Sequence, residues 1–193
     1  EMSKHKIDDL SPSIVRDFNK CILCRRCVAV CKNIQQIGAI DCINRGFDSC
    51  ISTVDDKSLN DVNCTFCGQC IQACPTGALH EKESINDLWI KLKEYLDSGK
   101  TIVVQTAPAV RVALGEEFQM DIGTNVTGKM VASLKRLGFD KVFDTNVGAD
   151  FTIMEEAHEF LERLKEKDNM PMITSCCPSW IKFIEMNYPD LLQ

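Results

Sequence analysis

The sequence predicts two domains of different class: a small α+β domain over residues 1–84 and part of an α/β domain over residues 85–193. The distribution of cysteines is the first observation behind this division. Ten of the 12 cysteines in the 193-residue chain fall between Cys21 and Cys74, and the other two are Cys176 and Cys177. The second observation is the segment from residue 85 on, where strand-like and helix-like patterns alternate, as is typical of a parallel sheet.

The cysteines of the first domain form two runs with the same spacing, C-x2-C-x2-C-x3-C, at an offset of 43 residues. This spacing holds iron–sulfur clusters in bacterial two-cluster ferredoxins, where the fourth cysteine of each run ligates the other cluster. We therefore predict a ferredoxin-like domain with two [4Fe–4S] clusters. The first cluster is assigned to Cys21, Cys24, Cys27 and Cys74, and the second to Cys31, Cys64, Cys67 and Cys70.

Zinc knuckles and disulfides are the alternatives to this assignment. Zinc ribbons use two C-x2-C pairs rather than a repeated run of four cysteines. The first residues carry no apolar signal segment, so we expect a cytoplasmic protein in which disulfides are disfavoured. Cys42 and Cys50 lie between the two runs. They are either buried small hydrophobic residues or an additional metal or disulfide pair.

The elements of the second domain follow from hydrophobic spacing. Apolar residues from Ile85 to Leu96 predict a helix that Gly99 ends, because glycine favours the left-handed cap. The β-branched run 101–106 predicts a buried strand. The predicted elements that follow are a helix at 110–117, a helix at 127–137, a strand at 141–144, a helix at 151–167, a strand at 172–174 and a helix at 179–187.

Two loops at predicted strand ends are candidate site segments, because such loops carry the sites of parallel sheets. One contains Ala107 and Pro108. The other contains Cys176 and Cys177 just before a helix, where the positive helix end favours a thiolate ligand. On spacing alone, this pair is equally well a structural or vicinal-disulfide pair.

In the predicted helix 151–167, Glu156, Glu159 and Arg163 share one face. The pattern fits an ordinary solvated edge with an ion pair, and it also fits a relay of carboxylates for protons. The net charge of −6 and the few scattered aromatic residues argue against a nucleic-acid partner. No apolar run has the length of about 18 residues that a membrane span requires.

The chain closely resembles the [FeFe]-hydrogenases, and within them the catalytic subunit of the multimeric NADP-reducing type. The segments that carry the resemblance are 10–17 (LSPSIVRD), both cysteine runs, 106–111 (TAPAVR), 144–150 (DTNVGAD), 152–156 (TIMEE) and 174–178 (TSCCP). The family interconverts protons, electrons and H₂. Its active site, the H-cluster, is a [4Fe–4S] cubane joined to a di-iron unit with CO, cyanide and a bridging dithiolate.

The resemblance implies roles for single residues. Cys177 would be the first ligand of the active-site cubane, and Cys176 would be the thiol that passes protons to the amine of the bridging dithiolate. Glu156 and Glu159 would form the proton path, with Arg163 near its exit. Ala107 and Pro108 would pack against the ligands of the di-iron unit.

The later cysteine motifs of the family are absent from these 193 residues. We therefore expect the H-cluster to be shared with a missing segment or with a large subunit, and electrons to come from a ferredoxin or from a flavin- or NAD(P)-binding subunit. A pure electron-transfer module, and a hydrogenase-like sensor or iron–sulfur assembly protein, are the competing functions. The intact 174–178 motif disfavours the latter.

Overall fold

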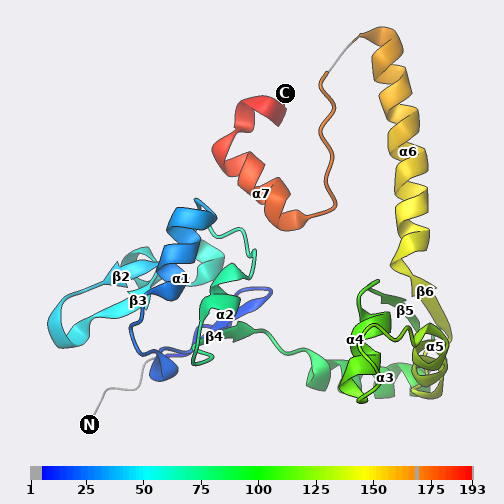
Figure 1. The fold of residues 1–193 in the computed structure, drawn as a ribbon, viewed down its shortest axis with the longest axis horizontal. Helices are drawn as coiled ribbons and strands as arrows, with labels where there is room; N and C mark the ends of the chain where they lie inside the picture. The colour runs from blue at the N-terminus through cyan, green and yellow to red at the C-terminus, as the bar shows by residue number, and fades with distance from the viewer. Residues whose placement is uncertain (1–5, 168–169, 193) are drawn as a thin grey trace. The chain divides into compact units, whose positions relative to one another are not determined.

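The computed structural model describes residues 6–167 and 170–192, which divide into two compact units. The first unit holds the residues up to Glu83 and those from Ile173 on, and the second runs from Ser84 to Met172 (Figure 1). Each unit has its own small sheets and helices. The domain ranges predicted from the sequence, 1–84 and 85–193, stay a prediction.

The first unit contains two antiparallel strand pairs. Its strands and helices are β1 (Ile14–Arg16), α1 (Arg26–Ala29), β2 (Asp41–Ile43), β3 (Cys50–Ser52), α2 (Gln69–Ala73), β4 (Leu79–Glu81) and α7 (Pro178–Asn187). Strand β1 pairs with β4, and β2 pairs with β3. A π-helical turn, Val30–Ile34, continues α1, and short 3₁₀ turns fill several of the loops.

Strand β1 is fixed at its start by a buried serine. The Ser11 hydroxyl accepts a hydrogen bond from the Ile14 amide at 2.8 Å and donates one to the Ile14 carbonyl at 2.7 Å. The strand then pairs with β4 in the register Ile14 to Glu81 and Arg16 to Leu79. This pairing joins the segment before the first cysteine run to the segment after the second. The chain between the two strands, which contains both runs, therefore forms one closed loop.

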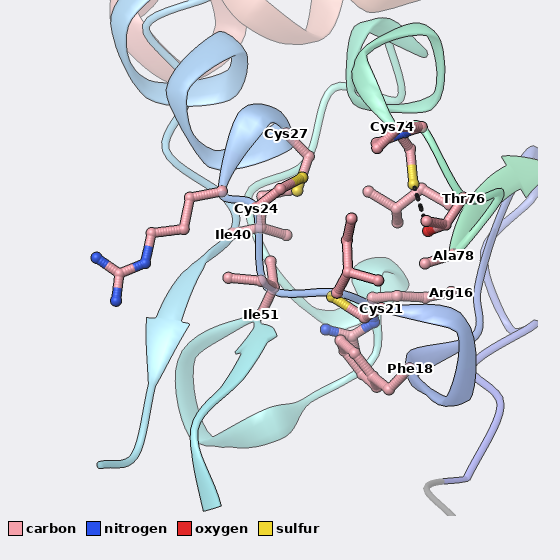
Figure 2. Close-up of a pocket in the computed structure, with 14 residues that line it drawn as sticks. Arg16, Phe18, Cys21, Cys24, Cys27, Ile40, Ile51, Cys74, Thr76 and Ala78 are labelled. Atoms are coloured by element: carbon pink, nitrogen blue, oxygen red, sulfur yellow. Dashed lines mark hydrogen bonds between the residues drawn. The ribbon is translucent and has the colours of Figure 1, made fainter. Parts of the chain in front are cut away.

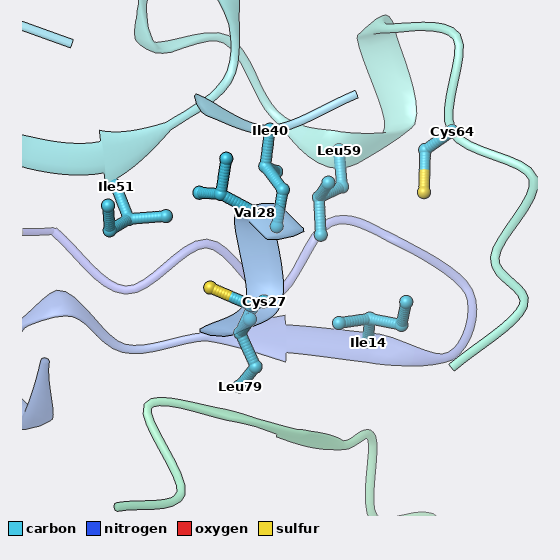
Figure 3. Packing of buried hydrophobic residues seen from close by; sticks show 8 residues of the cluster. All are labelled: Ile14, Cys27, Val28, Ile40, Ile51, Leu59, Cys64 and Leu79. Atoms are coloured by element: carbon cyan, nitrogen blue, oxygen red, sulfur yellow. The ribbon is translucent and has the colours of Figure 1, made fainter. Parts of the chain in front are cut away.

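The core of this unit is a small apolar cluster that includes two of the predicted cluster ligands (Figure 3). Its buried members are Ile14, Cys27, Val28, Ile40, Ile51, Leu59, Cys64 and Leu79. Cys27 and Cys64 come from different runs. The cysteine runs are therefore part of the core rather than loops attached to its surface.

The second unit is built around one pair of parallel strands. Its elements are α3 (Ile85–Ser98), β5 (Val103–Thr106), α4 (Val110–Glu117), α5 (Thr127–Arg136), β6 (Lys141–Asp144) and α6 (Thr145–Glu166). Strand β5 runs parallel to β6 with Thr106 opposite Asp144. The crossover between them contains α4 and α5, as a parallel connection requires. Leu92, Val126, Met130 and Phe139 are buried in this unit.

Three sequence predictions differ from the structure. The strand predicted at 101–106 forms as β5 but is not buried along its length, since Val103 is 53% exposed. Residues 172–174 form no strand, and Ile173 is 51% exposed. A β-branched run becomes a strand only when a neighbouring strand completes its hydrogen bonds, and no described strand pairs with this one. Helix α6 begins at Thr145 rather than at residue 151, because the Asp144 side chain caps it by accepting a hydrogen bond from the Asn146 amide.

Candidate iron–sulfur and catalytic sites

The first pocket of the ferredoxin-like unit brings together the four cysteines that the sequence assigned to one cluster (Figure 2). Cys21, Cys24 and Cys27 come from the first run, and Cys74 from the second. All four line a pocket with about 460 Å³ of empty space, part of it open to solvent. The remaining lining is mostly apolar.

A second pocket has the reverse arrangement, with three cysteines from the second run and one from the first. Cys64, Cys67 and Cys70 from the second run line it together with Cys31 from the first. The helical turn that starts at Val30 carries Cys31 toward this pocket, and Cys74 caps the end of α2 beside the other. Each run therefore contributes three cysteines to one pocket and its fourth cysteine to the other.

The backbone repeats between the two runs as closely as the cysteine spacing does. Leu23 and Phe66, equivalent positions, both have a φ of 57°. In each case the amide of this residue donates to the thiol two positions earlier, to Cys21 at 3.5 Å and to Cys64 at 3.4 Å. An amide aimed at a sulfur stabilises a thiolate, so both loops are shaped for thiolate ligands.

The cysteine thiols in these pockets differ in pKa. Burial raises the pKa of Cys27 to about 11 and that of Cys70, the equivalent residue, to about 12. Burial also raises the pKa of Cys74, but hydrogen bonds from the Leu79 and Thr76 amides and from the Thr76 hydroxyl outweigh it, so the net pKa is lowered. Since ligation requires thiolates, a metal bound here releases the protons of these thiols, so its affinity rises with pH.

Among the residues that the structure describes, no group of three His, Cys, Asp or Glu side chains is arranged to bind a metal ion. Four soft sulfur donors instead line each of the two pockets. This donor set fits an iron–sulfur cluster in each pocket. All twelve cysteines are free, so no pair is joined as a disulfide.

Cys42 and Cys50 face opposite sides of the β2–β3 hairpin. Cys50 is opposite Ile43, and Cys42 is opposite Ile51. Because adjacent residues in a strand point to opposite faces, the two thiols cannot join across the hairpin. Cys50 is buried, and Cys42 accepts a contact from the Arg25 guanidinium at 3.8 Å. The structure therefore favours the prediction of a small buried residue for Cys50 and excludes a direct pair with Cys42 in this hairpin.

The two loop residues of the second unit lie at the carboxyl end of β5. Ala107 and Pro108 are exposed and lead into α4. The Arg111 side chain donates to the Pro108 carbonyl at 2.9 Å and pairs with Asp144 at 2.7 Å. This ion pair fixes the loop to the end of β6, so the strand ends form one ordered edge.

The carboxylate stripe lies on α6. Glu156 and Arg163 are partly buried and Glu159 is exposed, and Arg163 forms an ion pair with Glu159. An exposed helix pair of this kind contributes little stability, about 0.3–0.5 kcal/mol. The pair fits an ordinary solvated helix edge, and the role of the stripe as a proton relay stays a prediction.

The adjacent cysteines lie at the start of α7. Cys177 is the N-cap residue, its amide donates to the Ser175 hydroxyl at 3.1 Å, and Pro178 is the first helical residue. Both thiols are exposed. They belong to the first unit, whereas the stripe and the Pro108 loop belong to the second. A path between these groups is therefore a proposal.

Sequence reasoning gave no role to Arg16, which is 3% exposed and lines the first cysteine pocket. The available signal was an arginine inside the apolar segment that precedes the first cysteine run. A charge in such a segment is rarely buried without a partner.

Comparison with known proteins agrees with this arrangement. Residues 11–80 match the ferredoxin-like domain of NADH-quinone oxidoreductase subunit 3, and residues 100–193 match the iron only hydrogenase large subunit, C-terminal domain. No helix in the described residues has the length and apolar character needed to cross a membrane.

Three similar curated proteins cover different shares of the chain. The NADP-reducing hydrogenase subunit HndD of Solidesulfovibrio fructosivorans is 49% identical over 100% of this chain and 33% of its own length. Iron hydrogenase 1 of Clostridium pasteurianum is 44% identical over 97% of this chain and 32% of its own length. Cytosolic iron-sulfur assembly component 3 of Rattus norvegicus is 29% identical over 70% of this chain.

The chain thus spans about one third of the length of the hydrogenases that it matches. The two hydrogenase matches cover nearly all of it and include both cysteine runs and the adjacent cysteines. Residues 100–193 belong to the iron-only hydrogenase family, and the similarity to its members extends over nearly the whole chain.

Proposed function

We propose that the chain supplies the electron relay and one part of the active site of an enzyme that interconverts protons, electrons and H₂. The observation that carries the proposal is the crossed arrangement of cysteines, three plus one in each of two pockets, on the same chain as a hydrogenase large-subunit domain. Two [4Fe–4S] clusters would supply one-electron transfer when bound. Their ligands would be the two sets of four cysteines.

The polypeptide would hold these two centres within one small unit. Cys31 and Cys74 each connect one run to the pocket of the other, so neither pocket can move independently. The mostly apolar lining would limit solvent contact with the sulfurs, and solvent exposure is one of the factors that set cluster potentials. Short separation and a fixed geometry favour stepwise electron transfer between the centres.

In the catalytic half, Cys177 would provide one thiolate ligand to the active-site cubane and Cys176 would hold the proton next to it. Glu156 and Glu159 would move that proton along α6, and Arg163 would hold Glu159 near the exit through their ion pair. Ala107 and Pro108 would pack against the di-iron unit. The described residues offer one ligand where the cubane needs four, so the other three come from a further segment or from a large subunit.

The partner assignments follow from the same reasoning. Electrons would enter from a ferredoxin or from a flavin- or NAD(P)-binding subunit, and a subunit of an NADP-reducing hydrogenase is among the similar proteins. Twelve free thiols favour a reducing compartment, so we propose the cytoplasm. A pure electron-transfer module is the second candidate, because the match to the NADPH-Fe(3+) oxidoreductase subunit alpha of Geobacter sulfurreducens covers 42% of this chain at 46% identity.

Infrared spectroscopy of the assembled, matured enzyme tests the proposal. We expect bands from CO and cyanide, and their absence would favour the electron-transfer module. The matched variants Cys176→Ala and Cys177→Ala then separate the two roles. Cys176→Ala keeps the infrared bands and loses most H₂ production, whereas Cys177→Ala loses both. Unchanged H₂ production in Cys176→Ala would remove this thiol from the proton path.

A further inference from the structure

Arg16 is a buried cation at the end of β1, between two pockets of the first unit. Its guanidinium donates to the Ser52 hydroxyl at 2.7 Å and to the Lys57 carbonyl at 2.8 Å, and it pairs with Asp8 at 3.2 Å. The side chain is 3% exposed. Of the described buried side-chain nitrogen and oxygen atoms, Arg16 Nε is the one without a hydrogen-bond partner.

The two sides of this guanidinium face different surroundings. Arg16 lines the pocket of Cys21, Cys24, Cys27 and Cys74. It also lines a separate pocket without cysteines, which Asp8 lines as well. In Figure 2 the guanidinium group is drawn between the Phe18 ring and Cys21. The Phe18 ring centroid lies 4.8 Å from the guanidinium carbon. Asp8 does not line the cysteine pocket.

A buried cation with an unused N–H donor is costly unless a group of opposite charge faces it. Asp8 supplies one such charge from its own side, with a side chain that is 11% exposed. On the cysteine side, the lining consists of cysteines, apolar residues, Thr76 and a second arginine, Arg25, and it contains no carboxylate. A cluster with four thiolate ligands is negatively charged, accepts hydrogen bonds at its sulfurs, and becomes more negative on reduction.

We propose that Arg16 is a positioning residue for the first cluster, to which it presents its unpartnered Nε–H and its charge, and that it stabilises the reduced state. The inference rests on the proposed two-cluster function. Asp8 opposes Arg16 in this role, because its carboxylate partly cancels the same charge. Cluster potentials are set by nearby charge and by hydrogen bonds to the sulfurs, so the two residues shift the potential in opposite directions.

The test is a redox titration of the reconstituted 193-residue chain, followed by electron paramagnetic resonance. In Arg16→Gln, we expect one midpoint potential to become more negative by about 59 mV, a tenfold lower equilibrium constant for one-electron reduction. The other potential stays in place. In Asp8→Asn, the same potential moves in the positive direction. Arg25→Gln is the matched control, since Arg25 lines the same pocket but is exposed and screened by solvent.

A purely structural role of the Arg16–Asp8 pair would weaken the fold in both variants without shifts of opposite sign. Equal potentials in all variants, or shifts of the same sign, would overturn the inference. If the Arg16→Gln variant does not retain the first cluster, the Asp8→Asn variant alone tests the inference. A potential that does not move in the positive direction would then overturn it. A wild-type chain that binds about four irons rather than about eight would instead contradict the two-cluster function itself.

Discussion

Burial decides the chemistry of individual cysteines in this chain. Cys27 and Cys70 occupy equivalent positions in the two runs, and burial raises the pKa of both thiols well above that of a free cysteine. Hydrogen bonds lower the pKa of Cys74 in spite of its burial. The ligand sets therefore combine a thiol with a lowered pKa and thiols that stay protonated near neutral pH until a metal replaces the proton.

This difference predicts the alkylation pattern of the metal-free chain. Only the thiolate reacts with iodoacetamide, so Cys27 and Cys70 should react at least about tenfold more slowly at pH 8 than the exposed Cys176. Because their pKa values are about 11 and about 12, their rates should keep rising through pH 10. Peptide mass spectrometry measures each site. Equal rates at all three cysteines would contradict the buried environment.

At the level of elements, close packing between α4 and the following loop orders the second unit. Gly115 in α4 is buried, and a Cβ placed there would lie 2.9 Å from the Thr124 carbonyl oxygen and 3.3 Å from a Val126 methyl carbon. The Val126 amide also donates to the Arg111 carbonyl at 2.9 Å. The loop therefore lies directly against the helix at a position where only glycine fits.

Gly115→Ala should destabilise the second unit by about 1–3 kcal/mol, because a backbone carbonyl must move to admit the methyl group. Gly128→Ala in α5 is the matched control, since no atom lies within 4 Å of its Cβ position. That change should leave stability equal or raise it by up to about 1 kcal/mol. Urea unfolding followed by circular dichroism compares them. Equal stability of the two variants would show that the loop does not contact α4 closely.

For the whole molecule, the proposed crossed ligation makes the two clusters interdependent. Each pocket takes its fourth cysteine from the distant run, so each bound cluster would link the two runs to each other. The pairing of β1 with β4 links the chain before the first run to the chain after the second run. Loss of Cys31 or Cys74 thus affects a cluster whose other three ligands lie between 33 and 53 residues away in the sequence.

Double variants distinguish crossed from uncrossed ligation by iron content after reconstitution. Cys31→Ala combined with Cys64→Ala should remove one cluster and leave about four irons, because both residues serve the second site. Cys31→Ala combined with Cys21→Ala should remove both clusters. Uncrossed ligation predicts the reverse result. Circular dichroism of each variant checks that the fold is retained.

The sequence by itself determined the repeat of cysteine runs and most of the helices and strands, because ligand spacing and hydrophobic periodicity are local properties. It also singled out candidate site residues in α6 and before α7, and their roles stay predictions. Only the tertiary structure decided that residues 172–174 are not a strand, since strand formation depends on a neighbour. It likewise decided that Cys42 and Cys50 face apart and that Arg16 is buried beside the first pocket. Pairing register and burial arise from contacts between distant segments, which no local pattern encodes.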